Sequence, residues 1–249
     1  MSDLVWYVPT ALLLVLLGLL VRRDAYRACP YFFAYVAFGV AADTTRFLVR
    51  DHPSLYSWTY WLTEAGYDVL GILVMYELNR TVLRNLARTR WGRLIFPAAL
   101  LAGIILSIAR AHAVPPQFGH GLAFYVIVGE IAVRCVQVLI FVATVAIVLI
   151  LGLRWRQYPF GIATGFGLYS VVALLMTTKF SDFGTRFIFF WTVTSVVAYS
   201  LAVLIWIWFF SAPQKPETPN PNLSAPSPEA FKEYQAMLER YLNSIRRIR

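Results

Sequence analysis

The chain has 249 residues, of which 59% are apolar and 16% aromatic, and its mean hydropathy is +0.62. Asp, Glu, Lys and Arg make up only 14% of the residues, against about 25% in ordinary soluble domains. A soluble protein of this composition could not cover its surface with polar groups, so the composition indicates an integral membrane protein. The formal charge of +9 does not indicate nucleic-acid binding, because the arginines recur in clusters between apolar segments, as membrane topology requires.

Seven apolar segments follow one another along the chain. They cover residues 4–21, 31–49, 57–78, 94–110, 122–152, 159–178 and 187–210. Each has the length that a helix needs to cross the hydrocarbon core of a bilayer. The fold class predicted is therefore all-α: a polytopic membrane protein with a seven-transmembrane-helix bundle over residues 1–210. The first segment is interpreted as a retained helix rather than a signal peptide, because no positive charge precedes it and its arginines follow it.

The charges of the loops predict the orientation. The first, third and fifth loops carry ten arginines: Arg22, Arg23, Arg27, Arg80, Arg84, Arg88, Arg90, Arg93, Arg154 and Arg156. The second, fourth and sixth loops carry four basic residues: Arg50, Arg110, Lys179 and Arg186. This imbalance places the N-terminus outside and the C-terminus in the cytoplasm. We expect a multi-pass protein of the cell membrane, of the kind found in the bacterial inner membrane.

The composition changes after the last apolar segment. Residues 211–227 form a proline-rich stretch and are predicted to be an extended linker. Residues 228–249 are predicted to form a cytoplasmic amphipathic helix, because apolar side chains recur at alternating spacings of 3 and 4. These residues, called the assembly seam below, are Phe231, Tyr234, Leu238, Tyr241, Ile245 and Ile248. The seam predicts contact with further copies of the chain or with another membrane-complex partner.

Ionisable and polar residues interrupt the apolar segments at similar depth. With the predicted orientation they fall in the outer half of the bundle, and their spacings of 3 and 4 put them on shared helix faces. A charge that faces lipid near the bilayer centre costs about 2.5–3.5 kcal/mol, so these residues should face one another inside the bundle. The set predicted to form a ligand pocket or a buried polar network is Asp43, Arg46, Tyr60, Glu64, Asp68, Glu130, Arg134, Gln137, Thr192, Ser195 and Tyr199.

The charges of this set do not balance. Four acids face two arginines, so two acids lack a buried cation and are expected to bind a proton, water or a small cationic ligand. Arg134 is expected to pair with a carboxylate from the second or third segment, in addition to Glu130. Glu77 and Arg80 are expected to pair at the inner rim.

The sequence contains little that indicates catalysis. All three histidines (His52, His112 and His120) fall in predicted external loops, and Cys29 and Cys135 form no CxxC motif. We therefore expect no enzyme activity, no metal and no cofactor. The leading hypothesis is a receptor-like or sensor-like membrane protein with an outward pocket. One alternative is a structural or accessory subunit whose charges only fix helix packing, and another is a small transporter or ion conductor.

Overall fold

The computed structural model describes residues 2–82, 90–111, 121–151, 158–183 and 188–212. Within these residues it contains α-helices and no strand. The helices are α1 (Ser2–Arg22), α2 (Ala25–Ala28), α3 (Pro30–Leu48), α4 (Pro53–Val82), α5 (Arg90–Arg110), α6 (Leu122–Leu151), α7 (Tyr158–Phe183) and α8 (Ile188–Ser211). Each predicted apolar segment coincides with one of the long helices. The linker beyond Ala212 and the whole assembly seam lie outside the described residues.

Among the residues that the structure describes, three helices are long and apolar enough to cross a membrane. These stretches are Phe124–Ala146 in α6, Tyr158–Met176 in α7 and Thr192–Ser211 in α8. Shorter apolar helices cover Tyr7–Arg22 and Leu94–Arg110. The length and hydropathy of these helices are those of a helical membrane protein.

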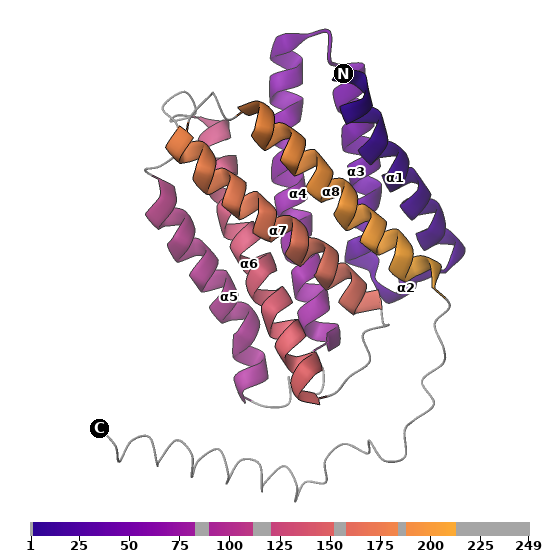
Figure 1. Ribbon diagram of the computed structural model, residues 1–249, viewed down its shortest axis with the longest axis vertical. Helices are drawn as coiled ribbons and strands as arrows, with labels where there is room; N and C mark the ends of the chain where they lie inside the picture. The colour runs from indigo at the N-terminus through magenta and orange to yellow at the C-terminus, as the bar shows by residue number, and fades with distance from the viewer. Residues whose placement is uncertain (1, 83–89, 112–120, 152–157, 184–187, 213–249) are drawn as a thin grey trace, which may run out of the picture. The chain divides into compact units, whose positions relative to one another are not determined.

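Six of the long helices pack in a closed ring. α1 packs against α3, α3 against α4, α4 against α6, α6 against α7, α7 against α8, and α8 against α1 (Figure 1). α5 stands outside this ring and packs chiefly on α6. The close approach of α5 depends on Gly103, because a β-carbon there would lie 2.7 Å from the backbone carbonyl oxygen of Ala132. Consecutive long helices run in opposite directions, so the N-terminus and the α3–α4 turn lie at one end of the ring.

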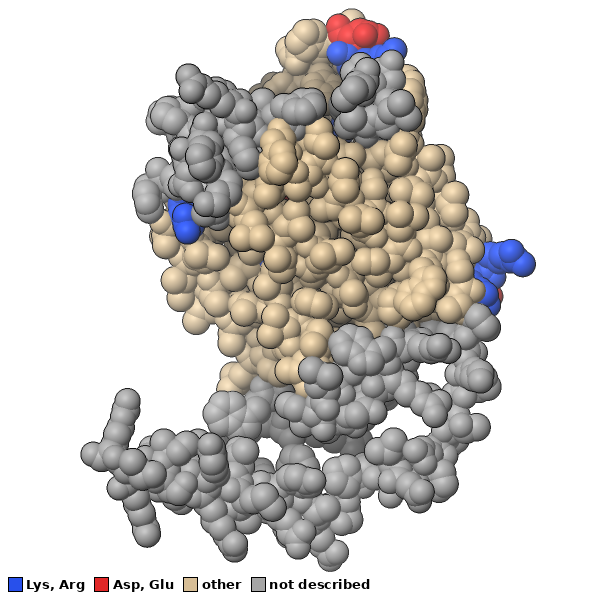
Figure 2. All heavy atoms as spheres, in the orientation of Figure 1, with Lys and Arg blue, Asp and Glu red and all other residues tan. Residues whose placement is uncertain are grey.

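Charged groups avoid the middle of the surface. On the face drawn in Figure 2, the described Lys, Arg, Asp and Glu side chains lie towards the ends of the helices, and an uncharged region separates them. Large apolar side chains are also exposed on α5, among them Leu101, Ile105 and Ile108. An apolar belt of this kind matches the hydrocarbon of a bilayer better than it matches water.

Aromatic side chains fill the ring at the end opposite the N-terminus. Phe32 stacks on Phe210 with ring centroids 5.6 Å apart, and it meets the edge of Trp206 at 5.1 Å. Phe166 lies 4.9 Å from Trp206. All four side chains are fully buried in the core, and we call them the aromatic plug. The plug leaves this half of the ring packed with apolar groups.

The glycines of α7 make room for aromatic side chains of α8. A β-carbon at Gly165 would lie 2.2 Å from the indole nitrogen of Trp206, and one at Gly161 would lie 2.4 Å from the Phe209 ring. The indole N–H of Trp206 donates to the backbone carbonyl of Ile162 at 3.3 Å. Small residues four positions apart therefore let α7 approach the aromatic face of α8, as they do in many membrane helix pairs.

Glu77 caps a neighbouring helix. Its carboxylate accepts the backbone N–H groups of Tyr31 and Phe32 at 3.4 and 3.2 Å, in the first turn of α3. Burial, together with the nearby Glu77 carboxylate, raises the pKa of the Cys29 thiol, just before α3, to about 12. The expected pair with Arg80 is wrong, because among the described residues Glu77 makes no ion pair. The α3 N–H groups lack partners within their own helix, so the carboxylate satisfies them instead.

Candidate functional site

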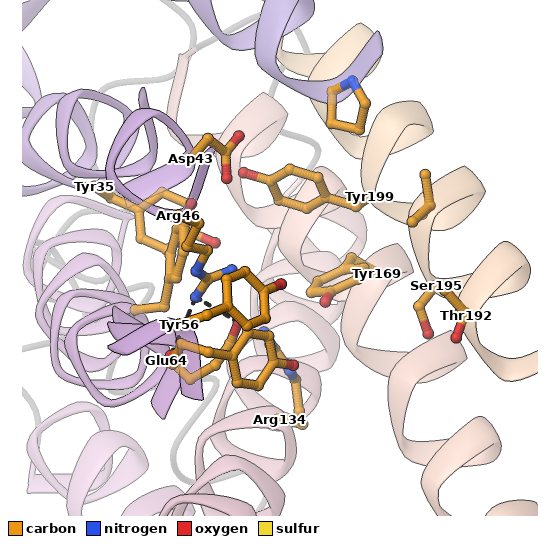
Figure 3. A pocket seen from close by; sticks show the side chains of 14 residues that line it. Tyr35, Asp43, Arg46, Tyr56, Glu64, Arg134, Tyr169, Thr192, Ser195 and Tyr199 are labelled. Carbon is orange, nitrogen blue, oxygen red and sulfur yellow. Dashed lines mark hydrogen bonds and ion pairs between the residues drawn. The ribbon is translucent and has the colours of Figure 1, made fainter. Parts of the chain in front are cut away.

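A cavity of about 390 Å³ lies inside the helix ring, in the half that holds the N-terminus. This volume is within the range of about 300–1,000 Å³ that is typical of small-molecule sites. All six ring helices contribute to its wall. The lining residues are Pro9, Tyr35, Asp43, Arg46, Tyr56, Tyr60, Glu64, Tyr67, Arg134, Tyr169, Thr192, Ser195, Val196 and Tyr199. Figure 3 shows the charged groups of α3 and α4 on one side and the hydroxyl groups of Thr192 and Ser195 on α8 across from them.

Arg46 of α3 is the centre of the first charged cluster. Its guanidinium forms an ion pair with Glu64 of α4 at 2.9 Å and donates to the Thr63 hydroxyl at 2.7 Å. The same group lies over the rings of Tyr60 and Tyr67, 4.7 and 5.8 Å from their centroids. The Arg46 side chain is only 9% exposed, and that of Glu64 is 23% exposed. The cluster joins α3 to α4 through partners that a buried guanidinium requires.

Arg134 of α6 is the centre of the second cluster. It forms an ion pair with Glu130 at 3.2 Å and donates to the Gln137 side-chain oxygen at 3.1 Å. The Ser170 hydroxyl of α7 donates to the same Gln137 oxygen. The guanidinium lies over the Tyr169 ring, 4.5 Å from its centroid. Arg134 is therefore fixed by its own helix and by α7.

The expected interhelical ion pair of Arg134 is wrong. Neither Glu64 nor Asp68 forms an ion pair with it, although all three side chains belong to the described residues. The physical reason is that Glu130, one turn away on the same helix, already satisfies the guanidinium. Arg46 differs from Arg134 in this respect. It forms its ion pair across helices with Glu64, and not with Asp43, which precedes it by three positions on α3.

Asp43 lines the cavity without a cation. One of its carboxylate oxygens accepts the Thr10 hydroxyl of α1 at 2.8 Å. Arg46 is near enough to act on the carboxylate electrostatically, yet within the described part of the chain Asp43 makes no ion pair. A carboxylate has room for about four hydrogen bonds. Asp43 therefore presents an incompletely neutralised charge to the cavity.

The hydroxyl group of Tyr199 also lacks a partner. It is buried in the cavity wall and makes no hydrogen bond with the part of the chain that the structure describes. In Figure 3 this hydroxyl points towards the Asp43 carboxylate. Ser195, one turn earlier on α8, likewise has no hydrogen bond among the described residues. A buried hydroxyl without a partner costs about 1–3 kcal/mol, so this part of the wall is polar and unsatisfied.

Three members of the predicted set lie away from the cavity lining. Glu130 and Gln137 act behind it, as partners of Arg134. Asp68 approaches α6, where its carboxylate oxygen lies 3.6 Å from the position of a β-carbon at Gly129. Asp68 forms no hydrogen bond or ion pair within the described ranges. The eight other members, Asp43, Arg46, Tyr60, Glu64, Arg134, Thr192, Ser195 and Tyr199, come together around the cavity.

Sequence reasoning missed much of the aromatic wall. Tyr56 and Tyr67 share the face of α4 that carries Tyr60 and Glu64, at spacings of 4, 4 and 3, and this periodicity could have identified them. Tyr35, two turns before Asp43 on α3, gives a similar signal. Tyr169 has no such signal, because it stands in a segment whose other polar residues are sparse.

A cavity lined by hydroxyl groups and carboxylates can hold a polar organic molecule. Among the described residues, no group of three or more His, Cys, Asp or Glu side chains could hold a metal ion. Comparison of the chain with protein-family models, curated proteins and solved structures gives no match.

Proposed function

We propose that this protein is a non-enzymatic, seven-helix membrane receptor or sensor that binds a small organic cation in its cavity. In this proposal all seven long helices cross the membrane, with the N-terminus outside and the C-terminus in the cytoplasm. The cavity then opens towards the outer half of the bilayer. Binding there biases the packing of the helix ring, and the cytoplasmic tail helix reports the change to a partner or to further copies of the chain.

The inward orientation of the charges supports the crossing of α3 and α4. These helices are less apolar than α6, α7 and α8 because they carry Asp43, Arg46, Glu64 and Asp68. The side chains of Arg46 and Glu64 are 9% and 23% exposed and pair with each other. A paired charge inside the bundle avoids most of the cost of meeting lipid. Helices of 19 and 30 residues are long enough to span the hydrocarbon core.

The observation that carries the proposal is the charge of the cavity wall. Arg46 is paired with Glu64, and Arg134 is paired with Glu130. Asp43 remains in the wall with a single hydroxyl donor. Asp43 is partly buried, and a carboxylate that loses hydration is destabilised unless a cation or several donors compensate it. A positively charged ligand supplies that compensation.

The aromatic plug supports binding over transport. Tyr35 lines the cavity, and the centroid of its ring lies 5.0 Å from that of Phe166. Phe166 belongs to the aromatic plug, whose side chains are fully buried and carry no charge. A transporter needs polar lining in both halves of the membrane. The polar residues that line the cavity are confined to one half of the helix bundle.

A structural role is the second candidate, because the arginine clusters favour it. Arg46 of α3 is held by neighbours from α4, and Arg134 is held by neighbours from α6 and α7. Such networks hold membrane helices in register without any ligand. The two candidates differ at Asp43, because helix packing alone does not require an acid in the wall without a cation.

A binding experiment separates these functions. The probes are 2-phenylethylammonium, its N,N,N-trimethyl derivative and neutral 2-phenylethanol, titrated into the purified protein in a phosphate buffer without amines. We expect at least one of the two cations to bind and raise the melting temperature, and the neutral alcohol to have no effect. Asp43→Asn should abolish the effect, whereas Asp51→Asn, which removes an exposed carboxylate at the same end of the bundle, should retain it. Absence of cation binding to the wild-type protein contradicts the proposal.

A further inference from the structure

We propose that the ligand is a protonated amine with at least two N–H bonds, rather than a quaternary ammonium ion, and that Asp43 and the Tyr199 hydroxyl hold its ammonium group. This inference rests on the proposed function and specifies the chemical class of the ligand. It follows from what the wall residues already contact and from what they lack.

The tyrosine rings are already engaged. Tyr60 and Tyr67 face the Arg46 guanidinium, and Tyr169 faces that of Arg134. Tyr35 packs against Tyr67 with centroids 5.4 Å apart. The remaining lining rings pair with tyrosine neighbours, Tyr56 with Tyr60 at 6.3 Å and Tyr199 with Tyr169 at 5.5 Å.

A quaternary ammonium ion is recognised mainly by open aromatic faces. The protein's own guanidinium groups occupy that role in this cavity, and their positive charge repels a further cation beside the same rings. The cavity therefore lacks the open cage that a quaternary ion needs. A ligand cation must be neutralised by direct contact with an acid.

Asp43 is the acid with capacity for this contact. Its second carboxylate oxygen has no hydrogen bond among the described residues, and the first accepts only Thr10. An N–H group of an ammonium ion can donate to the second oxygen and form a charge-assisted hydrogen bond. A quaternary ion has no N–H and can only approach the carboxylate at a longer distance.

Tyr199 supplies the second acceptor. Its hydroxyl is buried, has no partner and points towards Asp43 (Figure 3). When Tyr199 and Asp43 contact the same ammonium group, the phenol oxygen accepts an N–H donor. The free-energy cost of leaving this oxygen without a hydrogen bond is then removed. Two acceptors on one nitrogen require two N–H bonds, which primary and secondary ammonium ions have.

The experiment is a titration with a graded series. 2-Phenylethylammonium and its N-methyl, N,N-dimethyl and N,N,N-trimethyl derivatives lose one N–H at each step while the charge is kept. We expect affinity to fall across the series, by about tenfold or more between the secondary and the quaternary ion, since charge-assisted hydrogen bonds are lost. Equal affinity for the primary and the quaternary ion overturns this inference and leaves the proposed function standing. If none of the four ions binds, the result contradicts the proposed function itself, and not only this inference.

Tyr199→Phe tests the second acceptor separately from folding. The variant removes a buried hydroxyl that has no partner, so we expect unchanged or higher melting temperature without ligand and about tenfold weaker binding of the primary ion. Binding of the quaternary ion should not change. The matched control is Tyr158→Phe, in a ring that stacks on Phe210 in the other half of the bundle at 4.3 Å, and it should keep wild-type affinity. A Tyr199→Phe variant that binds the primary ion as the wild type does refutes the role of Tyr199.

Discussion

Replacement of Arg134 by alanine should destabilise the bundle more than any single change in an exposed charge. The Arg134 side chain is 8% exposed, and it donates to Glu130 at 3.2 Å and to Gln137 at 3.1 Å. Removal of one partner of a buried ion pair typically costs about 3–5 kcal/mol. Because Glu130 keeps 32% of its surface exposed and can be rehydrated, we expect the lower end of that range, about 3 kcal/mol. For a chain of this size, such a loss corresponds to a fall of roughly 6–12 °C in melting temperature.

The assay is thermal unfolding of the purified protein in one detergent. The matched control is Arg50→Ala, since the Arg50 side chain is 51% exposed and its pair with Asp51 at 3.8 Å is a surface contact. Surface pairs contribute about 0–1 kcal/mol, so the control should melt close to the wild type. Arg134→Lys should recover only part of the loss, because an ammonium group cannot reproduce the planar guanidinium fork. Equal melting temperatures for Arg134→Ala and Arg50→Ala would refute the reasoning.

Three further predictions concern packing, topology and assembly. Gly103→Ala should lower the free energy of unfolding by about 1–3 kcal/mol, because the added methyl group meets an α6 carbonyl oxygen at 2.7 Å. The control Gly18→Ala, whose methyl group would have no atom within 4 Å, should raise the free energy of unfolding by about 0.5–1 kcal/mol. Similar shifts in melting temperature for the two variants would contradict this account. A reporter fused after Arg249 should be cytoplasmic and one fused to the N-terminus external, and the reverse result would invalidate the proposed orientation. Leu238→Asp combined with Ile245→Asp should leave the helix bundle folded but remove a protein contact, measured by crosslinking in gently extracted membranes; unchanged crosslinked neighbours would show that the seam is not an assembly element.

The positions of the helices could be predicted from the sequence because long apolar runs have few alternatives. Each of the seven runs falls on a long helix. A helix that crosses the bilayer needs a long run of apolar residues, and such a run can be recognised from composition alone. The number of helices that cross the membrane is less evident, since α3 and α4 carry charges that lower their hydropathy.

The choice of partners could not be predicted in the same way. Helical spacing placed Arg46 near Asp43, and the predicted depth placed it level with Glu64. The direction of the guanidinium depends on helix rotation and on side-chain reach, which the sequence does not contain. Asp68 shares a face with Glu64, yet it lies a turn deeper and points towards Gly129 instead of the cavity. Tyrosines within apolar runs resemble interfacial belt residues, so the aromatic wall was not distinguished from them.

The contact between Glu77 and the first turn of α3 bears on the order in which the protein is made. The acceptor for the N–H groups of Tyr31 and Phe32 stands 46 and 45 positions later in the chain. A serine or aspartate beside α3 would have capped it as soon as it emerged from the ribosome. Here the Glu77 cap at the start of α3 can form only after α4 has been synthesised and lies beside α3. We therefore expect the first turn of α3 to reach its final structure together with α4.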